Sequence, residues 1–220
     1  MTVEYRVRIT GLTPLLMHHD DVEWADAMEA WKMDPKNKET SRAGDDRTPA
    51  FRWLGCLYHD GEAVAIPSDN LSTCMREGGA MIPLPNGKKN QTFKAKTQSG
   101  LAVDPVYWRL SVNGREIPLA PLLALRDEKS FEKHHETTRA LGFRLHVKRA
   151  KVGQTKHIRV RPYFDNWSAE GSIIVTDEQI TSDALSQILS YAGRYKGIGD
   201  WRPSSKQSPG PYGQFKAEIL

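Results

Sequence analysis

Lysine and arginine are spaced unevenly along this chain of 220 residues, and the spacing indicates a polyanionic partner. Residues 139–161 carry eight Lys and Arg and no acidic residue, and residues 78–103 carry four Lys and no acidic residue. Residues 20–46 instead carry nine acidic and four basic residues. One short basic run is usually a solvated face, but two acid-free basic stretches in a small chain of net charge +4 favour a nucleic acid.

A glycine-rich segment near the C-terminus combines small, aromatic and cationic residues. Gly197 and Gly199 permit a positive φ or a close approach of the backbone to a ligand. Trp201 and Tyr212 offer faces for base stacking, and Arg202 offers a fork that fits phosphate. The segment lacks both the GK[ST] ending of a phosphate-binding loop and the GxGxxG spacing of a dinucleotide fold. The alternative is a structural turn in which Trp201 anchors the core.

Two histidine-rich triplets have the side-chain types of metal ligands. They are His18-His19-Asp20 and His134-His135-Glu136, and neither has the HExxH spacing that places two histidines on one helix face. Cys56 and Cys74 lack CxxC partners, which disfavours a structural zinc site or a disulfide framework. We therefore predict no metal and no cofactor.

The overall composition is typical of a soluble globular protein, with 39% hydrophobic and 26% charged residues. No run approaches the roughly 20 apolar residues of a membrane helix, and the first residues lack the apolar region of a secretory signal. With two unpaired cysteines, this predicts a cytoplasmic protein without a membrane partner.

Alternation of apolar and polar residues gives the clearest strands. Residues 3–9 predict a half-buried strand, and residues 143–148 and 158–162 predict a hairpin with lysine and arginine on alternate positions. Residues 181–194 repeat apolar side chains at helical spacing behind a Thr/Ser/Asp cap. The other predicted elements are helices at 22–33 and 70–77, the second capped within 67–69; strands at 64–67, 106–112, 116–119, 171–176 and 214–220; and polar excursions at 36–52 and 83–100.

This order of elements predicts an α+β fold, in which split βαβ units build a ferredoxin-like sheet. We predict a single domain over residues 1–220. Its inserted excursions span about 20–60 and 83–103, and its basic hairpin spans about 143–162.

Three segments resemble one protein family in their order and spacing. The first is an opening strand that runs into an apolar turn with a proline, residues 7–16. The second is Ile66-Pro67-Ser68-Asp69-Asn70-Leu71 with Arg76 closing a short helix, and the third is the helix, glycine-rich loop and final strand at 184–215. Together they resemble the RAMP superfamily, the repeat-associated proteins that form the crRNA-bound backbone of CRISPR effector complexes. In the second segment Ser68 stands where that family has glycine, and Asp69 and Asn70 replace two serines.

The resemblance implies a modified RNA-recognition (ferredoxin-like) fold that binds the backbone of a guide RNA, with subunits repeated along it. The implied partners are single-stranded guide RNA, a complementary target DNA or RNA, further copies of the chain and other effector subunits. The predicted RNA-binding residues are Arg76, Lys88, Lys89, Lys94, Lys96, Arg144, Lys148, Arg149, Lys151, Lys156, Arg159, Arg161, Gly197, Gly199, Trp201, Arg202 and Tyr212.

Two alternatives stay open. Some family members cut target RNA with an aspartate in the loop after the first strand, and others process RNA with a histidine that activates the ribose 2′-OH. Candidates for these roles are His18, His19, Asp20, Asp21 and Asp26. Adjacent histidines on an extended segment point to opposite faces, so we favour a non-catalytic subunit over a RAMP-type endoribonuclease. The second alternative is a phage or mobile-element interaction protein without nucleic acid, in which the basic segments pack against acidic residues 20–46 of the next copy.

Overall fold

The computed structural model describes residues 2–37, 42–85, 87–206 and 208–220. The larger of two sheets has the strand order β10-β1-β9-β5-β3, with β4 paired to β9 and β6 to β5. All of its pairings are antiparallel. Its strands are β1 (Val3–Gly11), β3 (Ala65–Pro67), β4 (Leu101–Asp104), β5 (Tyr107–Val112), β6 (Arg115–Glu116), β9 (Trp167–Val175) and β10 (Phe215–Ile219).

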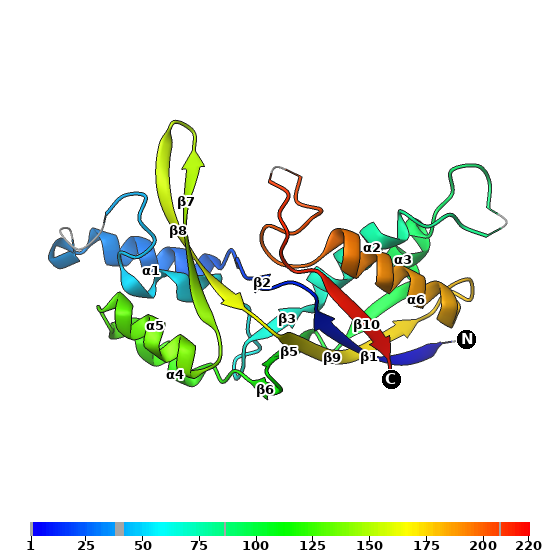
Figure 1. The fold of residues 1–220 in the computed structure, drawn as a ribbon, viewed down its shortest axis with the longest axis horizontal. Helices are drawn as coiled ribbons and strands as arrows, with labels where there is room; N and C mark the ends of the chain where they lie inside the picture. Colours follow the sequence, from blue (N-terminus) through cyan, green and yellow to red (C-terminus); the bar gives the residue numbers. More distant parts are fainter. Residues whose placement is uncertain (1, 38–41, 86, 207) are drawn as a thin grey trace.

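The fold is the α+β, ferredoxin-like arrangement predicted from the sequence. The chain passes from β1 through α2 (Ser68–Gly79) to β4 and β5, which share one position in the sheet because both pair with β9. It then passes from β9 through α6 (Ser182–Tyr191) to β10 at the edge. Both helices cover the same face of the sheet, which leaves the other face open (Figure 1).

Strand β1 shows why these residues form this sheet. Val7 and Ile9 are buried beneath the helices, whereas Arg6 and Arg8 alternate with them and point to the open face. On that face Glu170 lies 2.5 Å from Arg8 Nε and 4.0 Å from Arg6 Nη2. The open face therefore carries paired charges.

Two insertions, one between β1 and β3 and the other between β6 and β9, build a second region beside the ferredoxin-like core. Its sheet has the order β2-β8-β7, and the β7–β8 hairpin extends beyond the rest of the fold (Figure 1). The elements of this region are β2 (Leu15–Leu16), β7 (Arg144–Val152), β8 (Thr155–Phe164), α1 (Val22–Met33), α4 (Ala120–Leu123), α5 (Phe131–Ala140) and the short 3-10 turns η1 (Pro35–Asn37), η2 (Ala50–Cys56) and η3 (Ala124–Asp127).

Two sequence-based expectations about local structure are wrong. The predicted excursion at 83–103 ends early, because α3 (Lys94–Gly100) is helical and β4 pairs with β9. This helix packs on α2, where Thr97 is buried against Gly79. The predicted side-chain cap of α2 is also absent, because the helix begins at Ser68 behind Pro67, and the Ser68 amide donates to the Val106 carbonyl instead.

The glycine-rich loop follows a π-helical turn, η4 (Ala192–Lys196), and leads to β10. Among the described residues, no helix combines the length and apolar character needed to cross a bilayer. The single domain over residues 1–220 remains a prediction.

Candidate nucleic-acid interface

The β7–β8 hairpin places like charges opposite one another across its two strands. Its register pairs His146 with Arg161, Lys148 with Arg159, and Lys151 with Lys156. Directly opposed residues of an antiparallel pair lie close together, and like charges there are destabilising. Electrostatic repulsion between these opposed cations therefore destabilises the hairpin.

Carboxylates neutralise the base of the hairpin but not its outer half. Arg161 Nε lies 3.2 Å from Asp200 Oδ2, and Arg159 Nη1 lies 3.2 Å from Asp46 Oδ1. Arg144, at the start of β7, lies 3.1 Å from Asp165. No carboxylate in the described part of the chain forms an ion pair with the remaining cations, which are Lys148, Arg149, Lys151 and Lys156.

Aromatic rings from the hairpin and the glycine-rich loop form one cluster, which we call the aromatic cluster: His146, Tyr163, Trp201 and Tyr212. Trp201 stacks on Tyr212 at a centroid distance of 6.3 Å, and His146 stacks on Tyr163 at 5.6 Å. Lys148 Nζ lies 4.2 Å from the centre of the Trp201 ring. Trp201 is half-buried and lies outside the hydrophobic core, so it is not the core anchor of the alternative interpretation. The two segments predicted separately to bind RNA therefore meet.

The glycines of the loop are required by its backbone path. Gly197 and Gly199 have φ values of 67° and 79°. A Cβ on Gly199 would overlap the carbonyl oxygen of Leu16, which accepts a 2.9 Å hydrogen bond from the Asp200 amide. The guanidinium of Arg202 donates within the loop, to the Gly199 carbonyl at 3.2 Å. The loop is therefore fixed against β2, and Arg202 stabilises the conformation of the loop through this hydrogen bond.

His18 is held between the loop and the hairpin. Its Nε2 lies 3.3 Å from Arg161 Nη2, and its Nδ1 lies 3.8 Å from Asp200 Oδ2. Because a guanidinium only donates, Nε2 accepts and the proton sits on Nδ1. Burial, followed by the charge of Arg161, lowers the pKa of His18 and keeps the imidazole neutral. Its lone pair is occupied by Arg161, which leaves no free base in this arrangement.

Two of the three segments that resemble the RAMP superfamily, and a residue just after the other segment, line a polar pocket of about 210 Å³. His18 follows the first of these segments, Asn70 belongs to the second, and Asp200 belongs to the third. The remaining lining residues are Tyr58, Gly199 and Arg202. Asn70 and Asp200, which are more than a hundred residues apart in the sequence, thus line one site.

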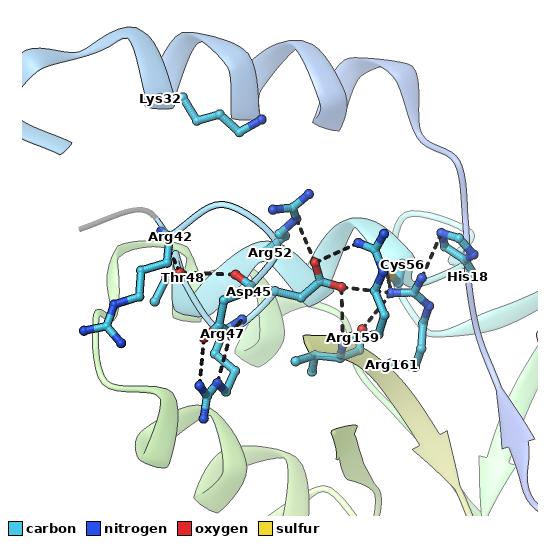
Figure 2. A network of polar contacts seen from close by, with 12 residues as sticks. His18, Lys32, Arg42, Asp45, Arg47, Thr48, Arg52, Cys56, Arg159 and Arg161 are labelled. Atoms are coloured by element: carbon cyan, nitrogen blue, oxygen red, sulfur yellow. Dashed lines mark hydrogen bonds and ion pairs between the residues drawn. The ribbon is translucent and has the colours of Figure 1, made fainter. Parts of the chain in front are cut away.

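A buried aspartate that the sequence analysis did not single out pairs with three neighbouring arginines, Arg52, Arg159 and Arg161, which Figure 2 shows close together. Asp46 is 3% exposed, and its carboxylate lies 3.5 Å from Arg52, 3.2 Å from Arg159 and 3.4 Å from Arg161. It also accepts a 3.3 Å hydrogen bond from the Val160 amide. The segment carrying it runs alongside β8, with the Asp46 amide donating to the Ile158 carbonyl. In the sequence Asp46 belongs to a polar stretch that looked solvated.

The second basic stretch lies elsewhere. Helix α3, which carries Lys94 and Lys96, and the loop before it lie at the opposite end of the molecule from the hairpin (Figure 1). Lys96 is paired with Asp177 at 2.9 Å. Arg76 lies in the last turn of α2, roughly 9 Å along the helix axis from Asn70. The structure therefore does not join these residues, or Lys88 and Lys89 in that loop, to the hairpin surface.

The other catalytic candidates of the first loop line one groove together with His18. His19 packs its ring against Tyr58 at 4.8 Å. Asp21 caps α1 by accepting a hydrogen bond from the Trp24 amide, while Asp20 and Asp26 are exposed. No hydrogen bond or ion pair among the described residues joins any of them to the imidazole of His18, whose partners are Arg161 and Asp200.

His134 and His135 lie within α5. His134 Nδ1 accepts a 3.0 Å hydrogen bond from Trp53 Nε1, and its Nε2 donates to the Glu128 carbonyl at 3.0 Å. His135 packs edge-on against Phe131. No three His, Cys, Asp or Glu side chains in the described ranges lie close enough together to hold a metal ion.

Comparison with known proteins gives no family assignment. No protein-family model and no curated protein match the chain. One similar solved structure is the crystal structure of Cmr6 from Pyrococcus furiosus, with 11% identity, 99% of each chain covered and a TM-score of 0.37. Another is a chain in the cryo-EM structure of the Type III-B Cmr-beta bound to cognate target RNA and AMPPnP. It has 13% identity and a TM-score of 0.30, and the match covers 98% of this chain and 62% of that one. At TM-scores below 0.5 these likenesses carry no argument, so the proposals below rest on the residues of this chain.

Proposed function

We propose that this chain binds single-stranded RNA through the β7–β8 hairpin and the glycine-rich loop. The observation that carries the proposal is the set of opposed hairpin cations that have no carboxylate partner among the described residues. A polyanion relieves this repulsion, and each neutralised phosphate also releases condensed counter-ions. Phosphate contacts position a strand without reading its sequence, which suits a subunit that must hold any guide.

The aromatic cluster supports a single strand over a duplex. Unpaired bases expose their faces, and stacking on tryptophan, tyrosine or histidine is sequence-tolerant. Trp201 lies directly beside Lys148, so a base on the ring and a phosphate on the ammonium group can belong to neighbouring nucleotides. This combination of stacking platform and cation is typical of single-strand binding grooves.

We further propose that the chain is a guide-RNA-binding backbone subunit of a CRISPR effector complex of the RAMP type. The meeting of the second and third family-like segments at one pocket, beside His18, supports this assignment. The partners would be further copies of the chain along the RNA, other effector subunits and a complementary target DNA or RNA. The occupied lone pair of His18 favours binding over RNA cleavage.

The direct experiment is to purify the chain and to identify any nucleic acid that accompanies it by its absorbance spectrum and its sensitivity to RNase or DNase. We expect RNase-sensitive material, in lengths that rise by a regular increment per subunit. Added single-stranded RNA should bind with an affinity that falls as salt rises, by about 0.7 log units per phosphate contact for each log unit of salt. Absence of RNA, together with no binding at low salt, would contradict the proposal and would favour the protein-interaction alternative.

A pair of variants locates the site. Lys151→Gln with Lys156→Gln removes two unpartnered charges from the hairpin and should weaken binding of a short oligonucleotide. Lys88→Gln with Lys89→Gln removes the same charge at the other end of the molecule and should leave that binding unchanged. Equal losses in the two variants would instead extend the interface to the second basic stretch.

A further inference from the structure

The polar pocket of about 210 Å³ between the glycine-rich loop and α2 lies next to Trp201. Asp200 and Arg202, the two neighbours of Trp201 in the sequence, both line it. The hairpin gives a second link, because Arg161, which binds Asp200, lies directly opposite His146 of the aromatic cluster. A nucleotide whose base stacks on Trp201 therefore brings its sugar close to the pocket.

The pocket combines hydrogen-bond donors and acceptors without an excess of charge. Its lining holds one carboxylate, Asp200, and one guanidinium, Arg202, beside the amide of Asn70 and the hydroxyl of Tyr58. Burial raises the pKa of Tyr58, so its hydroxyl stays protonated, and burial lowers the pKa of His18, which stays neutral. A phosphate would meet the carboxylate here. A neutral hydroxyl, which both donates and accepts, suits the donors and the acceptors of the lining together.

Two of the lining side chains keep unused hydrogen-bonding capacity. The Asn70 amide hydrogen-bonds to Tyr58 and has no other side-chain partner among the described residues. Asp200 accepts one hydrogen bond at each carboxylate oxygen, from the Trp201 amide at 3.0 Å and from Arg161 at 3.2 Å. Since a carboxylate offers about four acceptor positions, Asp200 can accept from a further donor.

Arg202 supplies another donor. Its Nε donates to the Ser204 hydroxyl and its Nη1 to the Gly199 carbonyl, while its Nη2 has no partner in the described part of the chain. The pocket has room for much more than one water molecule, which needs about 10–15 Å³ of cavity space. It can therefore bind a polar group from outside the chain.

The lining groups are held in place by the fold. The Tyr58 hydroxyl donates to the His18 carbonyl at 3.0 Å, and Arg161 holds the His18 imidazole (Figure 2). Asn70 belongs to the first turn of α2, where the next residue, Leu71, is buried in the core. The pocket is thus formed before any ligand binds, which lowers the entropic cost of recognition.

We infer that this pocket binds the 2′-hydroxyl of a ribose and thereby selects RNA over DNA. The inference rests on the proposed function and deepens it, since the hairpin cations bind phosphates that both nucleic acids share. The 2′-hydroxyl, a donor and an acceptor, is the group by which a protein distinguishes RNA from DNA at a given site. In this assignment Asn70 and Arg202 donate to the hydroxyl oxygen, and the Asp200 carboxylate accepts a hydrogen bond from it.

The experiment compares binding of three short oligonucleotides with identical bases: RNA, DNA that contains deoxyuridine, and 2′-O-methyl RNA. The wild-type chain should bind the RNA roughly three- to tenfold more tightly than the other two, the factor expected for one hydrogen-bonded hydroxyl. Lys151→Gln with Lys156→Gln should lower the affinities for RNA and DNA by the same factor, because this change removes phosphate contacts alone. Equal wild-type affinity for all three would overturn the inference and leave strand binding intact. Failure of the wild-type chain to bind RNA would overturn the proposed function.

Variants of Asn70 assign the selectivity to the pocket. Asn70→Ala should weaken RNA binding and leave DNA binding unchanged, so that the ratio of the two affinities falls toward one. Asn70→Ser, which keeps a donor and an acceptor, should retain part of the ratio. Gln179→Ala, the matched control, removes an exposed amide from the turn before α6 and should alter neither affinity. A wild-type ratio in Asn70→Ala would overturn the inference. Thermal unfolding identifies any loss of fold, and the comparison of oligonucleotides on the wild-type chain needs no variant.

A single deoxynucleotide, placed at the 3′ end or inside the RNA, separates the two sources of the hydroxyl. A loss of affinity confined to the terminal substitution assigns the ribose at the 3′ end. A loss confined to internal substitutions assigns riboses along the strand. Wild-type affinity for every substituted RNA would overturn the inference.

Discussion

The β7–β8 hairpin and strand β1 on the open face of the larger sheet both carry arginine or lysine at alternate positions. The two surfaces differ in how far carboxylates neutralise these cations. On the open face Arg109 forms ion pairs with Asp60, Glu62 and Glu116. On the hairpin Lys151 faces another lysine. One surface is internally neutralised, and the other is left with its charge.

The carboxylate of Asp60 shows how the open face neutralises its cations. Burial opposes ionisation of Asp60, yet hydrogen bonds from the Ala63 and Glu62 amides and from Arg109 lower its pKa to about 2. This carboxylate belongs to the folded sheet and is ionised at neutral pH. Alternating cations alone therefore do not indicate a binding surface. What matters is whether the fold supplies their counter-charges.

The largest expected effect comes from reversing the hairpin charges. Lys148→Glu with Lys151→Glu and Lys156→Glu should lower the affinity for single-stranded RNA by at least about 100-fold at low salt, because three phosphate contacts become repulsive. The matched change on the open face is Arg6→Glu with Arg8→Glu and Arg109→Glu, and it should have little effect. Binding titrations of both variants measure the difference, and comparable losses would end the distinction between the two surfaces.

Removal of the stacking face should have the next largest effect. Trp201→Ala should weaken RNA binding about tenfold, in line with the 1–3 kcal/mol that one stacked base contributes. The melting temperature should change little, because Trp201 lies outside the core. Tyr107→Ala, on the open face, is the control and should bind as wild type. A large loss of stability with normal affinity in the folded fraction would make Trp201 a structural residue.

The pH dependence of binding should distinguish the two surfaces by a smaller factor. Burial, then the charges of Lys148 and Arg144, lower the pKa of His146, so the free protein keeps this imidazole neutral near pH 6.5. A phosphate nearby would raise this pKa, and binding would then take up a proton. Affinity should rise roughly two- to fivefold between pH 7.5 and 5.5, since a full pKa unit corresponds to about tenfold. His146→Gln should remove the rise, and retention of the full rise in this variant would exclude His146 as its source.

The same lowered pKa affects stability with a defined sign. Below about pH 6.5 the unfolded chain binds protons that the folded chain resists, so the free energy of unfolding should fall as the pH falls. Burial also lowers the pKa of His134, which accepts a hydrogen bond from Trp53. Thermal unfolding of His134→Gln, whose amide can replace both hydrogen bonds, should show a weaker pH dependence than wild type between pH 7 and 5. An unchanged slope would assign the effect to other groups.

The smallest effect is a gain in stability. Lys151→Glu places opposite charges across the hairpin and should stabilise the fold by about 0.2–1 kcal/mol, the range for cross-strand pairs, while it weakens RNA binding. Chemical unfolding in the absence of RNA measures the gain. Lower stability together with weaker binding would show that repulsion between Lys151 and Lys156 does not destabilise the free protein.

Much of the fold could be predicted from local patterns. The alternation around Val7 and Ile9 located β1, and the apolar repeat behind Thr181 located α6, because each element buries one regular face. Helix α5 could not be found in this way, since its buried residues are the polar His134 and Thr138. Their burial depends on tertiary partners such as Trp53, which lies 81 residues away in the sequence.

The candidate site, like the fold, could be predicted only in part from the sequence. The hairpin cations and the glycine-rich loop could be identified from residue types, but their meeting at Trp201 depends on the fold. Asp46 could not be identified, because an aspartate in a polar stretch normally stays in water. Its arginine partners Arg159 and Arg161 lie 113 and 115 residues further along the chain. Nothing in the local sequence indicates that burial.

The most direct test of the contrast between the two surfaces is ultraviolet cross-linking of bound single-stranded RNA, followed by mass spectrometry of the cross-linked peptides. The account predicts cross-links within residues 143–164 and 197–213, centred on the aromatic cluster, and none on the open-face strands. Cross-links concentrated at Tyr107 and its neighbours on the open face, with the hairpin and the glycine-rich loop unmodified, would contradict it.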